Sequence, residues 1–207
     1  MIRIGVLASG RGSNFQSIID GIKEGDIDGK IVVLITDKEN AGAIERAEKN
    51  GIISEVVLRK NFETREHMDK EIRRILDEKK VDLVVLAGYM RIISPELLGP
   101  YENRIINIHP ALLPSFPGTN GAKDAFEHGV KVSGCTVHFV DGGMDTGPII
   151  EQTCVRIDDC KTPEEVAAKI LPHEHATMRK VVANFSKGKY IVEGRRVRYE
   201  RKNASAD

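Results

Sequence analysis

The chain has 207 residues, a length for which we expect one large domain, or one domain with a small C-terminal addition, and no second catalytic domain. Its 31 basic and 31 acidic residues cancel, which excludes an overall field that recruits nucleic acid or an anionic membrane. Three cysteines without metal-ligand spacing, the lack of a signal peptide and the lack of an apolar run of roughly 20 residues predict a reduced, cytoplasmic protein outside the membrane.

Strands and helices alternate through the first half of the chain. The apolar run at residues 2–7 is typical of a strand, and it leads into the glycine-rich turn at residues 9–14 and then into apolar residues at helical spacing. Further strands are expected at residues 31–36, 54–58 and 82–86, and helices at residues 41–49 and 64–79. This alternation predicts an α/β fold with a mostly parallel sheet, helices on both faces and a binding crevice beyond the carboxyl ends of the strands.

The second half of the chain is expected to extend this sheet. A short helix should begin at Ser94-Pro95, and the buried strand at residues 104–108 should deliver His109 at its end. The remaining expected elements are a fixed loop at residues 112–118, a helix at 122–127, strands at 131–139 and 149–157 joined by the polar connector 141–148, a long helix from 162 to about 185 kinked at Pro172, a hairpin of residues 190–192 and 195–199, and a frayed tail at 202–207.

The glycine-rich turn at residues 9–14 is the first candidate binding segment. Backbone N–H groups at the start of a helix, together with the helix dipole, favour an anion, and a phosphate is the natural ligand. The turn is neither a complete dinucleotide fingerprint nor a P-loop, and a purely structural turn would use the same glycines. Both interpretations therefore stand at this point.

Asn107, His109 and Asp145 are the residues most suited to chemistry. Alternation along a strand places Asn107 and His109 on one face, where an amide can donate to a developing oxyanion and an imidazole can carry a proton. A pair that merely hydrogen-bonds a loop is the competing interpretation. Asp145 could orient the His109 ring and raise the pKa of its imidazolium form, although local composition favours an ordinary turn aspartate.

The segment His173-Glu174-His175 does not form a metal site by its spacing. Residues i and i+2 of a helix face different directions, and no further histidine or cysteine lies at a useful distance, so we expect no metal. Glu174 could instead bind a substrate amine or hydroxyl if its helix borders the cleft. Three other histidines are not accompanied by residues that would form a catalytic or metal site with them, and they are interpreted as structural: His67, His128 and His138.

In their order along the chain, these motifs resemble the folate-dependent formyltransferase family. The resemblance covers almost the whole chain and is carried by residues 6–14, 86–92, 107–114, 137–140, 144–148 and 174–176. It implies a single formyltransferase domain, residues 1–207, with a Rossmann-like, ribonucleotide-phosphate-binding part at residues 1–100. It also implies a catalytic part at residues 101–207, whose strands and long helix complete the folate cleft.

The resemblance also implies a reaction: transfer of the formyl group of 10-formyltetrahydrofolate to the amine of 5-phosphoribosylglycinamide, in de novo purine (IMP) biosynthesis. We expect direct transfer, without a covalent enzyme intermediate, by a monomer or homodimer. The implied roles are catalysis by Asn107, His109 and Asp145; ribonucleotide binding by Gly12, Ser13, Asn14 and Glu174; and folate binding by Arg65, Met90, Arg91, Ile92, Ile93 and Asn107.

Three other functions are compatible with parts of the sequence. Methionyl-tRNA formyltransferases share the Asn-Ile-His-Pro motif but carry a further C-terminal domain and should show a basic surface, neither of which we expect here. A formyltetrahydrofolate deformylase, with water as the acceptor, usually bears an N-terminal regulatory domain, whereas this core starts at residue 1. A non-catalytic nucleotide-binding or folate-binding module is the third alternative, and the presence of Asn107, His109 and Asp145 together argues against it.

Overall fold

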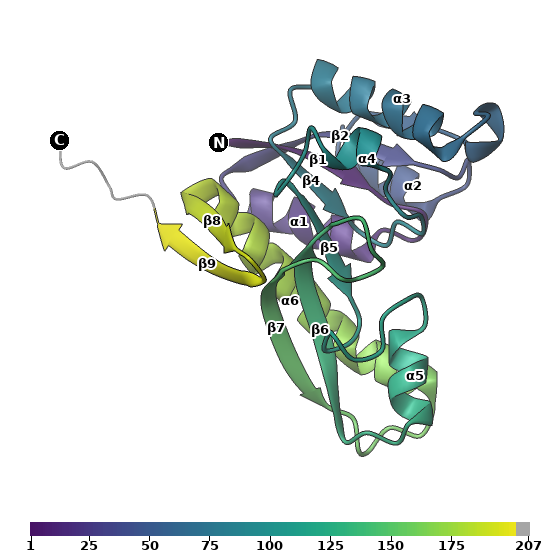
Figure 1. Cartoon of the computed structure of the whole chain (residues 1–207), viewed down its shortest axis with the longest axis vertical. Helices are drawn as coiled ribbons and strands as arrows, with labels where there is room; N and C mark the ends of the chain where they lie inside the picture. The colour runs from purple at the N-terminus through teal and green to yellow at the C-terminus, as the bar shows by residue number, and fades with distance from the viewer. Residues whose placement is uncertain (202–207) are drawn as a thin grey trace.

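The computed structural model describes residues 1–201. Within them, seven strands form one sheet in the order β3-β2-β1-β4-β5-β6-β7, and two more pair as a hairpin (Figure 1). The strands are β1 (Ile2–Leu7), β2 (Gly29–Thr36), β3 (Ser54–Val56), β4 (Leu83–Leu86), β5 (Ile105–His109), β6 (Val132–Phe139), β7 (Ile149–Arg156), β8 (Gly188–Glu193) and β9 (Arg196–Arg201).

The large sheet is mostly parallel, as predicted. Strands β3, β2, β1, β4 and β5 pair in parallel, and β6 and β7 add an antiparallel edge. The strand order reverses at β1, which lies between β2 and β4. In α/β sheets the ligand crevice opens beyond the carboxyl ends of the strands at such a reversal.

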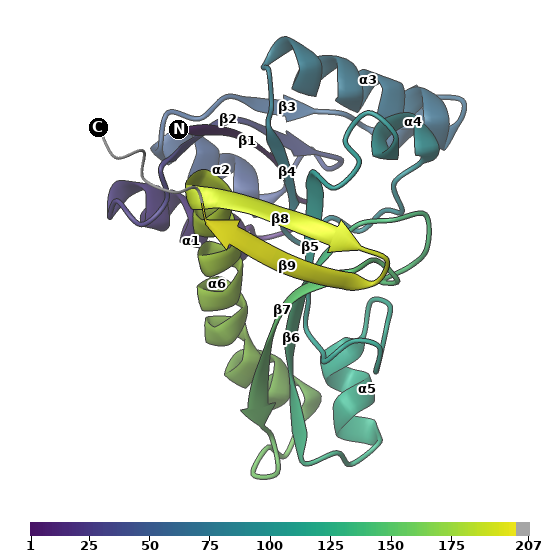
Figure 2. The same ribbon diagram turned by 60° about the vertical axis from the view of Figure 1, so that its left-hand side comes forward.

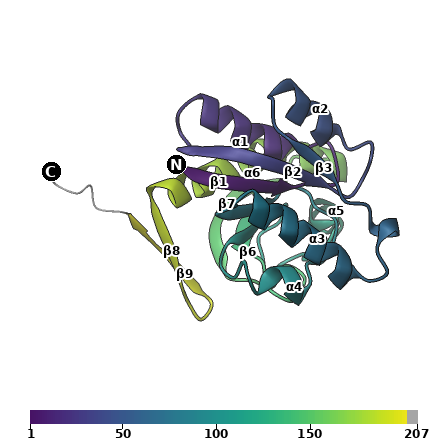
Figure 3. The ribbon, with the colours of Figure 1, turned by 90° about the horizontal axis from the view of Figure 1, so that it is seen from above.

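Helices cover both faces of the sheet, which confirms the predicted fold class. Helices α1, α2 and α6 lie on one side, and α3 and α4 on the other (Figure 3). The helices of residues 1–201 are α1 (Ser13–Lys23), α2 (Gly42–Lys49), α3 (Arg65–Glu78), α4 (Pro95–Leu98), α5 (Gly121–Glu127) and α6 (Pro163–Lys187), with a short 3-10 helix η1 (Arg59–Asn61) before α3.

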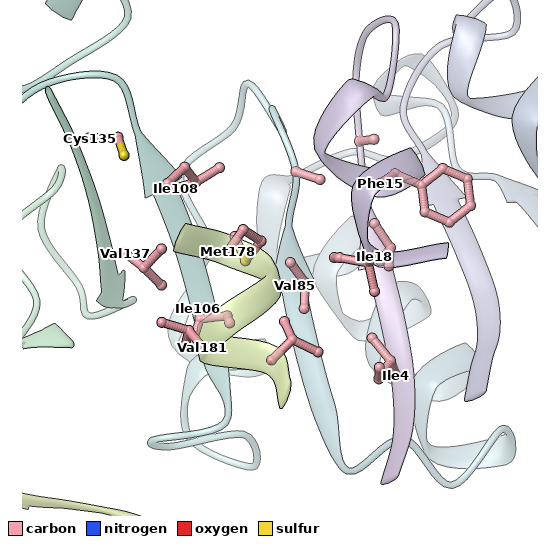
Figure 4. Close-up of a cluster of buried hydrophobic side chains, with 14 of the residues drawn as sticks. Ile4, Phe15, Ile18, Val85, Ile106, Ile108, Cys135, Val137, Met178 and Val181 are labelled. Atoms are coloured by element: carbon pink, nitrogen blue, oxygen red, sulfur yellow. The ribbon is translucent and has the colours of Figure 1, made fainter. Parts of the chain in front are cut away.

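The core consists of two buried clusters, one on each face. Side chains of a buried strand alternate between the faces, so the apolar runs supply both clusters. On β1, Ile4 packs with Phe15 of α1 (Figure 4), whereas Leu7 belongs to the cluster that contains Ile72 of α3. This double burial holds the carboxyl ends of the strands at fixed positions.

Helix α6 packs against α1, α5, β6 and β7, and it carries Glu174. It begins at a cap in which the Thr162 side chain accepts a hydrogen bond from the backbone N–H of Glu165, and it continues through Pro172. After it, the β8–β9 hairpin lies beside α6 (Figure 2), with the Tyr190 ring 4.9 Å from Phe185. The predicted order of elements is therefore confirmed through residue 201.

The boundaries differ from the predicted ones by a few residues in places. Strand β5 extends one residue further, so that His109 is its last residue rather than its successor, and α6 runs to Lys187. Helix η1 was not predicted. The tail at residues 202–207 lies outside the described residues, and the division near residue 100 stays a prediction, although β4 and β5 pair across it in one sheet.

Candidate active site

The site lies where the carboxyl ends of β1, β4 and β5 meet. Two hydrogen bonds of Ser9, which lies two residues beyond β1, join the glycine-rich turn to the loop after β4. The Ser9 backbone N–H donates to the carbonyl of Gly88 over 3.0 Å, and Ser9 Oγ accepts from the backbone N–H of Met90 over 3.0 Å. The segments that sequence alone marks as separate motifs therefore touch.

A cavity of about 360 Å³ opens beside these strand ends. The residues that line it come from four segments: Leu86, Gly88, Tyr89, Met90, Arg91, Ile92 and Ile93 at the end of β4 and in the loop after it; Asn107, Ile108, His109 and Pro110 at the end of β5; Gly118 and Thr119; and His138, Val140, Asp141, Gly143, Met144 and Asp145. Asn107, His109 and Asp145, which are far apart in the sequence, are thus brought together on one wall.

His109 is buried, with its side chain 3% exposed, and has a defined tautomer. Its Nε2 lies 2.6 Å from the backbone carbonyl of Phe116, which can only accept, so Nε2 carries the hydrogen. Its Nδ1 lies 3.4 Å from Oδ2 of Asp145. Burial lowers the pKa of His109 below 6.5 despite the opposing charge of Asp145, so the neutral ring presents an unprotonated Nδ1 at neutral pH.

Asp145 is held in a left-handed backbone conformation, with φ 55°. Aspartate tolerates this region better than most residues do. The carboxylate accepts a hydrogen bond from the backbone N–H of Gly118 over 2.7 Å. Burial raises the pKa of Asp145, but the close His138 and His109 rings and the hydrogen bond from Gly118 outweigh that effect, and the pKa lies below 3.8. Asp145 is therefore ionised at neutral pH.

His138 is a member of this cluster that sequence reasoning missed. Its Nδ1 lies 2.8 Å from the carbonyl of Phe139, which leaves Nε2 as an acceptor, 3.2 Å from Nδ2 of Asn107. Asn107 Nδ2 also lies 3.5 Å from Oδ1 of Asp145. The signal lies in the register of β5 and β6, which places Asn107 opposite His138. One sequence cannot supply that register.

This arrangement fixes which atoms can act on a substrate. The NH₂ group of Asn107 faces two acceptors of the protein, Nε2 of His138 and Oδ1 of Asp145, and these contacts fix the orientation of the amide. The group carries two hydrogens, which are shared between these acceptors and an oxygen atom of a ligand. Nδ1 of His109 can take a proton, and Asp145 beside it favours the resulting cation. An oxyanion donor and a proton carrier are thus adjacent, as acyl transfer requires.

The glycine-rich turn has the properties of an anion site. Gly12 precedes α1 with φ 70°, and a Cβ there would lie 2.8 Å from that of Ala43, so the position requires glycine. The first turn of α1, where Ser13 and Asn14 lie, holds no acidic side chain. Its free backbone N–H groups and the helix dipole therefore favour a phosphate.

Glu174 of α6 reaches this turn. It is 9% exposed, and its Oε2 accepts a hydrogen bond from Nδ2 of Asn14 over 2.9 Å. Burial raises the pKa of Glu174 above 4.5, against the lowering effect of Asn14. Within residues 1–201, Oδ1 of Asn14 is buried without a hydrogen-bond partner. The predicted ribonucleotide residues are therefore together, at the amino end of α1.

The predicted folate residues are brought together with one exception. Met90 and Ile92 are 60% and 45% exposed at the cavity, Ile93 is buried behind them, and Arg91 stands beside them. Arg65 begins α3, does not line the cavity and pairs with Glu66 at 3.3 Å. A folate role for Arg65 stays a prediction.

Within residues 1–201, no group of three or more His, Cys, Asp or Glu side chains is arranged to hold a metal ion. No helix there is both long enough and apolar enough to cross a membrane.

Comparisons with known proteins agree with this geometry. The profile of the family described as "Formyl transferase" matches residues 2–182. Phosphoribosylglycinamide formyltransferase of Bacillus subtilis (strain 168) is 46% identical over 175 residues, 84% of this chain and 90% of the relative. The trifunctional purine biosynthetic protein adenosine-3 of Drosophila pseudoobscura pseudoobscura is 41% identical over 207 residues, and this chain spans 15% of its length.

A solved structure is similar throughout. The crystal structure of glycinamide ribonucleotide transformylase 1 from Symbiobacterium toebii superposes with a TM-score of 0.94 at 45% identity, and the match covers 96% of this chain and 94% of that one. The resemblance drawn from the motifs is confirmed by these matches. The chain belongs to the formyl transferase family.

Proposed function

We propose that this protein is a phosphoribosylglycinamide formyltransferase, which transfers the formyl group of 10-formyltetrahydrofolate to the amine of 5-phosphoribosylglycinamide in purine biosynthesis. The observation that carries the proposal is the shared wall of one cavity: Asn107, His109 and Asp145 lie beside the apolar loop 88–93. The similarity to an enzyme of that name, over 90% of the length of the Bacillus subtilis relative, supports 5-phosphoribosylglycinamide as the acceptor of the formyl group.

Both substrates fit the residues that are present. The exposed side chains of Met90 and Ile92 offer an apolar surface to the flat ring system of the folate. The turn formed by Gly12, Ser13 and Asn14 offers backbone N–H groups to the ribonucleotide phosphate, and Glu174 offers a carboxylate to its hydroxyls or amine. The folate is a co-substrate in this scheme, and the reaction needs no metal.

The transfer proceeds directly from donor to acceptor. The amine nitrogen attacks the formyl carbon, and the electron pair of the C=O bond moves to oxygen. Asn107 donates an N–H to that oxygen, with His109 beside it. The bond from carbon to the folate nitrogen then breaks, and its electron pair returns to that nitrogen. No covalent bond to the protein forms.

One proton must move from the attacking nitrogen to the departing one. Nδ1 of His109, or a water held by Asp145, receives it and passes it on. The imidazolium that forms is stabilised by Asp145 at 3.4 Å, while its Nε2–H stays on the carbonyl of Phe116. Asp145 therefore acts through both orientation and charge.

Dependence of the reaction on the acceptor distinguishes this function from a deformylase and from a binding module. Consumption of 10-formyltetrahydrofolate is followed spectroscopically with and without 5-phosphoribosylglycinamide. We expect tetrahydrofolate release that requires the ribonucleotide and matches the formylated product one to one. Release at the same rate without the ribonucleotide would indicate a deformylase, and binding of both ligands without turnover would indicate a binding module; either result contradicts the proposal.

We also propose a cytoplasmic location and a monomer or homodimer. The three cysteines of the chain, Cys135, Cys154 and Cys160, are free thiols in the structure, as in a reducing compartment. Subcellular fractionation tests the location, and sedimentation velocity distinguishes the two oligomeric states.

A further inference from the structure

The loop 88–93 forms the apolar wall of the cavity, yet its own packing is poor. Met90 and Ile92 are 60% and 45% exposed, whereas Ile93 is 3% exposed. A loop that presents large apolar side chains to solvent gains little from burial at those positions. Something else must hold the loop in the shape that a ligand needs.

Asp37 holds the middle of the loop. It follows β2 directly, its side chain is 3% exposed, and its Oδ2 accepts a hydrogen bond from Nε of Arg91 over 2.7 Å. Arg91 lines the catalytic cavity and also a neighbouring cavity of about 560 Å³, so it stands on the ridge between them. Anchoring through Nε leaves the outer nitrogens of the guanidinium for a ligand.

Asp69 holds the end of the loop. It lies on α3, is 2% exposed, and its Oδ2 accepts a hydrogen bond from the backbone N–H of Ser94 over 2.6 Å. Burial raises the pKa of Asp69, and the hydrogen bond from Ser94 opposes that effect. At the start of the loop, Ser9 binds Gly88 and Met90 as described above. The loop is thus fixed at its beginning, middle and end by three separate elements.

Stability does not explain these carboxylates. Burying a carboxylate is costly, and replacing a buried ion pair by apolar side chains is often neutral or stabilising. Asp37 even keeps one buried oxygen, Oδ1, without a hydrogen-bond partner among residues 1–201. Neither Asp37 nor Asp69 lines the catalytic cavity, so neither meets the reacting atoms.

We propose that Asp37 and Asp69 are positioning residues for the formyl donor, which hold the loop 88–93 and the Arg91 side chain in the conformation that binds it. This inference rests on the proposed function, since it assigns the loop to the donor. It predicts that the two carboxylates affect donor binding selectively and leave the ribonucleotide and the chemical step nearly unchanged.

The test compares the parent with Asp37→Ala, Asp37→Asn and Asp69→Ala, and with the control Glu78→Gln, an exposed change at the end of α3. Steady-state kinetics give kcat and the KM of each substrate, calorimetry gives the Kd of tetrahydrofolate, and thermal unfolding gives Tm. The Asn variant keeps an acceptor oxygen for Arg91 and serves as the conservative rescue.

We expect both alanine variants to raise the donor KM and the tetrahydrofolate Kd roughly tenfold, because that factor corresponds to the free energy of one hydrogen bond to a charged group. kcat and the ribonucleotide KM should change less than about twofold, and Asp37→Asn should recover most of the loss. An unchanged donor KM and Kd in Asp37→Ala would overturn the inference. So would an equal rise in both KM values that follows the fall in Tm, because that pattern indicates a structural role.

Failure of the proposed function would look different. A parent that lacks formyl transfer contradicts that function, while the tetrahydrofolate Kd of the parent relative to Asp37→Ala still decides the inference. A parent that does not bind tetrahydrofolate overturns both. If Asp69→Ala does not fold, the two Asp37 variants decide.

Discussion

Asn14 and Glu174 are joined by a 2.9 Å hydrogen bond from Nδ2 to Oε2, although 160 residues separate them in the sequence. The bond ties the first turn of α1 to the middle of α6. It places a buried carboxylate next to the glycine-rich turn, which is the proposed binding site for the ribonucleotide.

The stability of the protein should depend on pH through Glu174. Burial raises its pKa above 4.5, so the folded state binds this proton more tightly than the unfolded state. Its contribution to stability is complete below 4.5 and is lost as the pH rises through the raised pKa. Compared with Glu174→Gln, the parent should therefore gain stability as the pH falls. Urea unfolding at a series of pH values measures this, and a constant difference would contradict it.

Activity should depend on the neutral form of His109. Burial lowers its pKa below 6.5, so protonation, which blocks Nδ1, should begin only below that pH. We expect kcat/KM, measured from pH about 5 to 8, to fall on the acid side with an apparent pKa below 6.5. An acid limb above 6.5 would instead show that the Asp145 charge dominates over burial.

Asn107→Ala should reduce kcat by about 10²–10³, the usual effect of removing one oxyanion donor, with a smaller change in KM.

His138→Phe should reduce kcat roughly tenfold, because Asn107 loses the acceptor 3.2 Å from its Nδ2. The two effects should not add in the double variant, since both act through one amide. Additive losses would mean that His138 does not orient Asn107.

Asp145→Asn should lower kcat by roughly 10²-fold or more while the KM values change little. The amide keeps an oxygen for the backbone N–H of Gly118 but removes the charge beside Nδ1 of His109. Asp158→Asn, at an exposed position after β7, is the matched control and should retain the parental rate. Parental turnover in Asp145→Asn would remove this residue from the mechanism.

The apolar pattern predicts most of the fold because a strand buried on both faces needs a continuous apolar run and an amphipathic helix needs helical spacing. Residues 2–7 and 82–86 illustrate this, since the strands lie there within one residue. Boundaries depend on hydrogen bonds that composition does not encode, which is why β5 reaches His109. Helix η1 is a single tight turn with no periodicity to detect.

The site is predicted less completely because it depends on register and on long-range contacts. The sequence alone favours an ordinary turn for Asp145, and its proximity to His109 follows from the packing of two loops. His138 joins Asn107 through the pairing of β5 with β6. Asp37 and Asp69 resemble surface carboxylates in the sequence, and their burial against the loop 88–93 emerges only in three dimensions.

The most direct test of the account is the single-turnover rate of formyl transfer from 10-formyltetrahydrofolate to 5-phosphoribosylglycinamide, with enzyme in excess, for the parent and His109→Ala. The account predicts formylated ribonucleotide and tetrahydrofolate in equal amounts from the parent, and a rate lower by roughly 10²-fold or more in the variant. A variant that transfers the formyl group at the parental rate would contradict the assignment of the site.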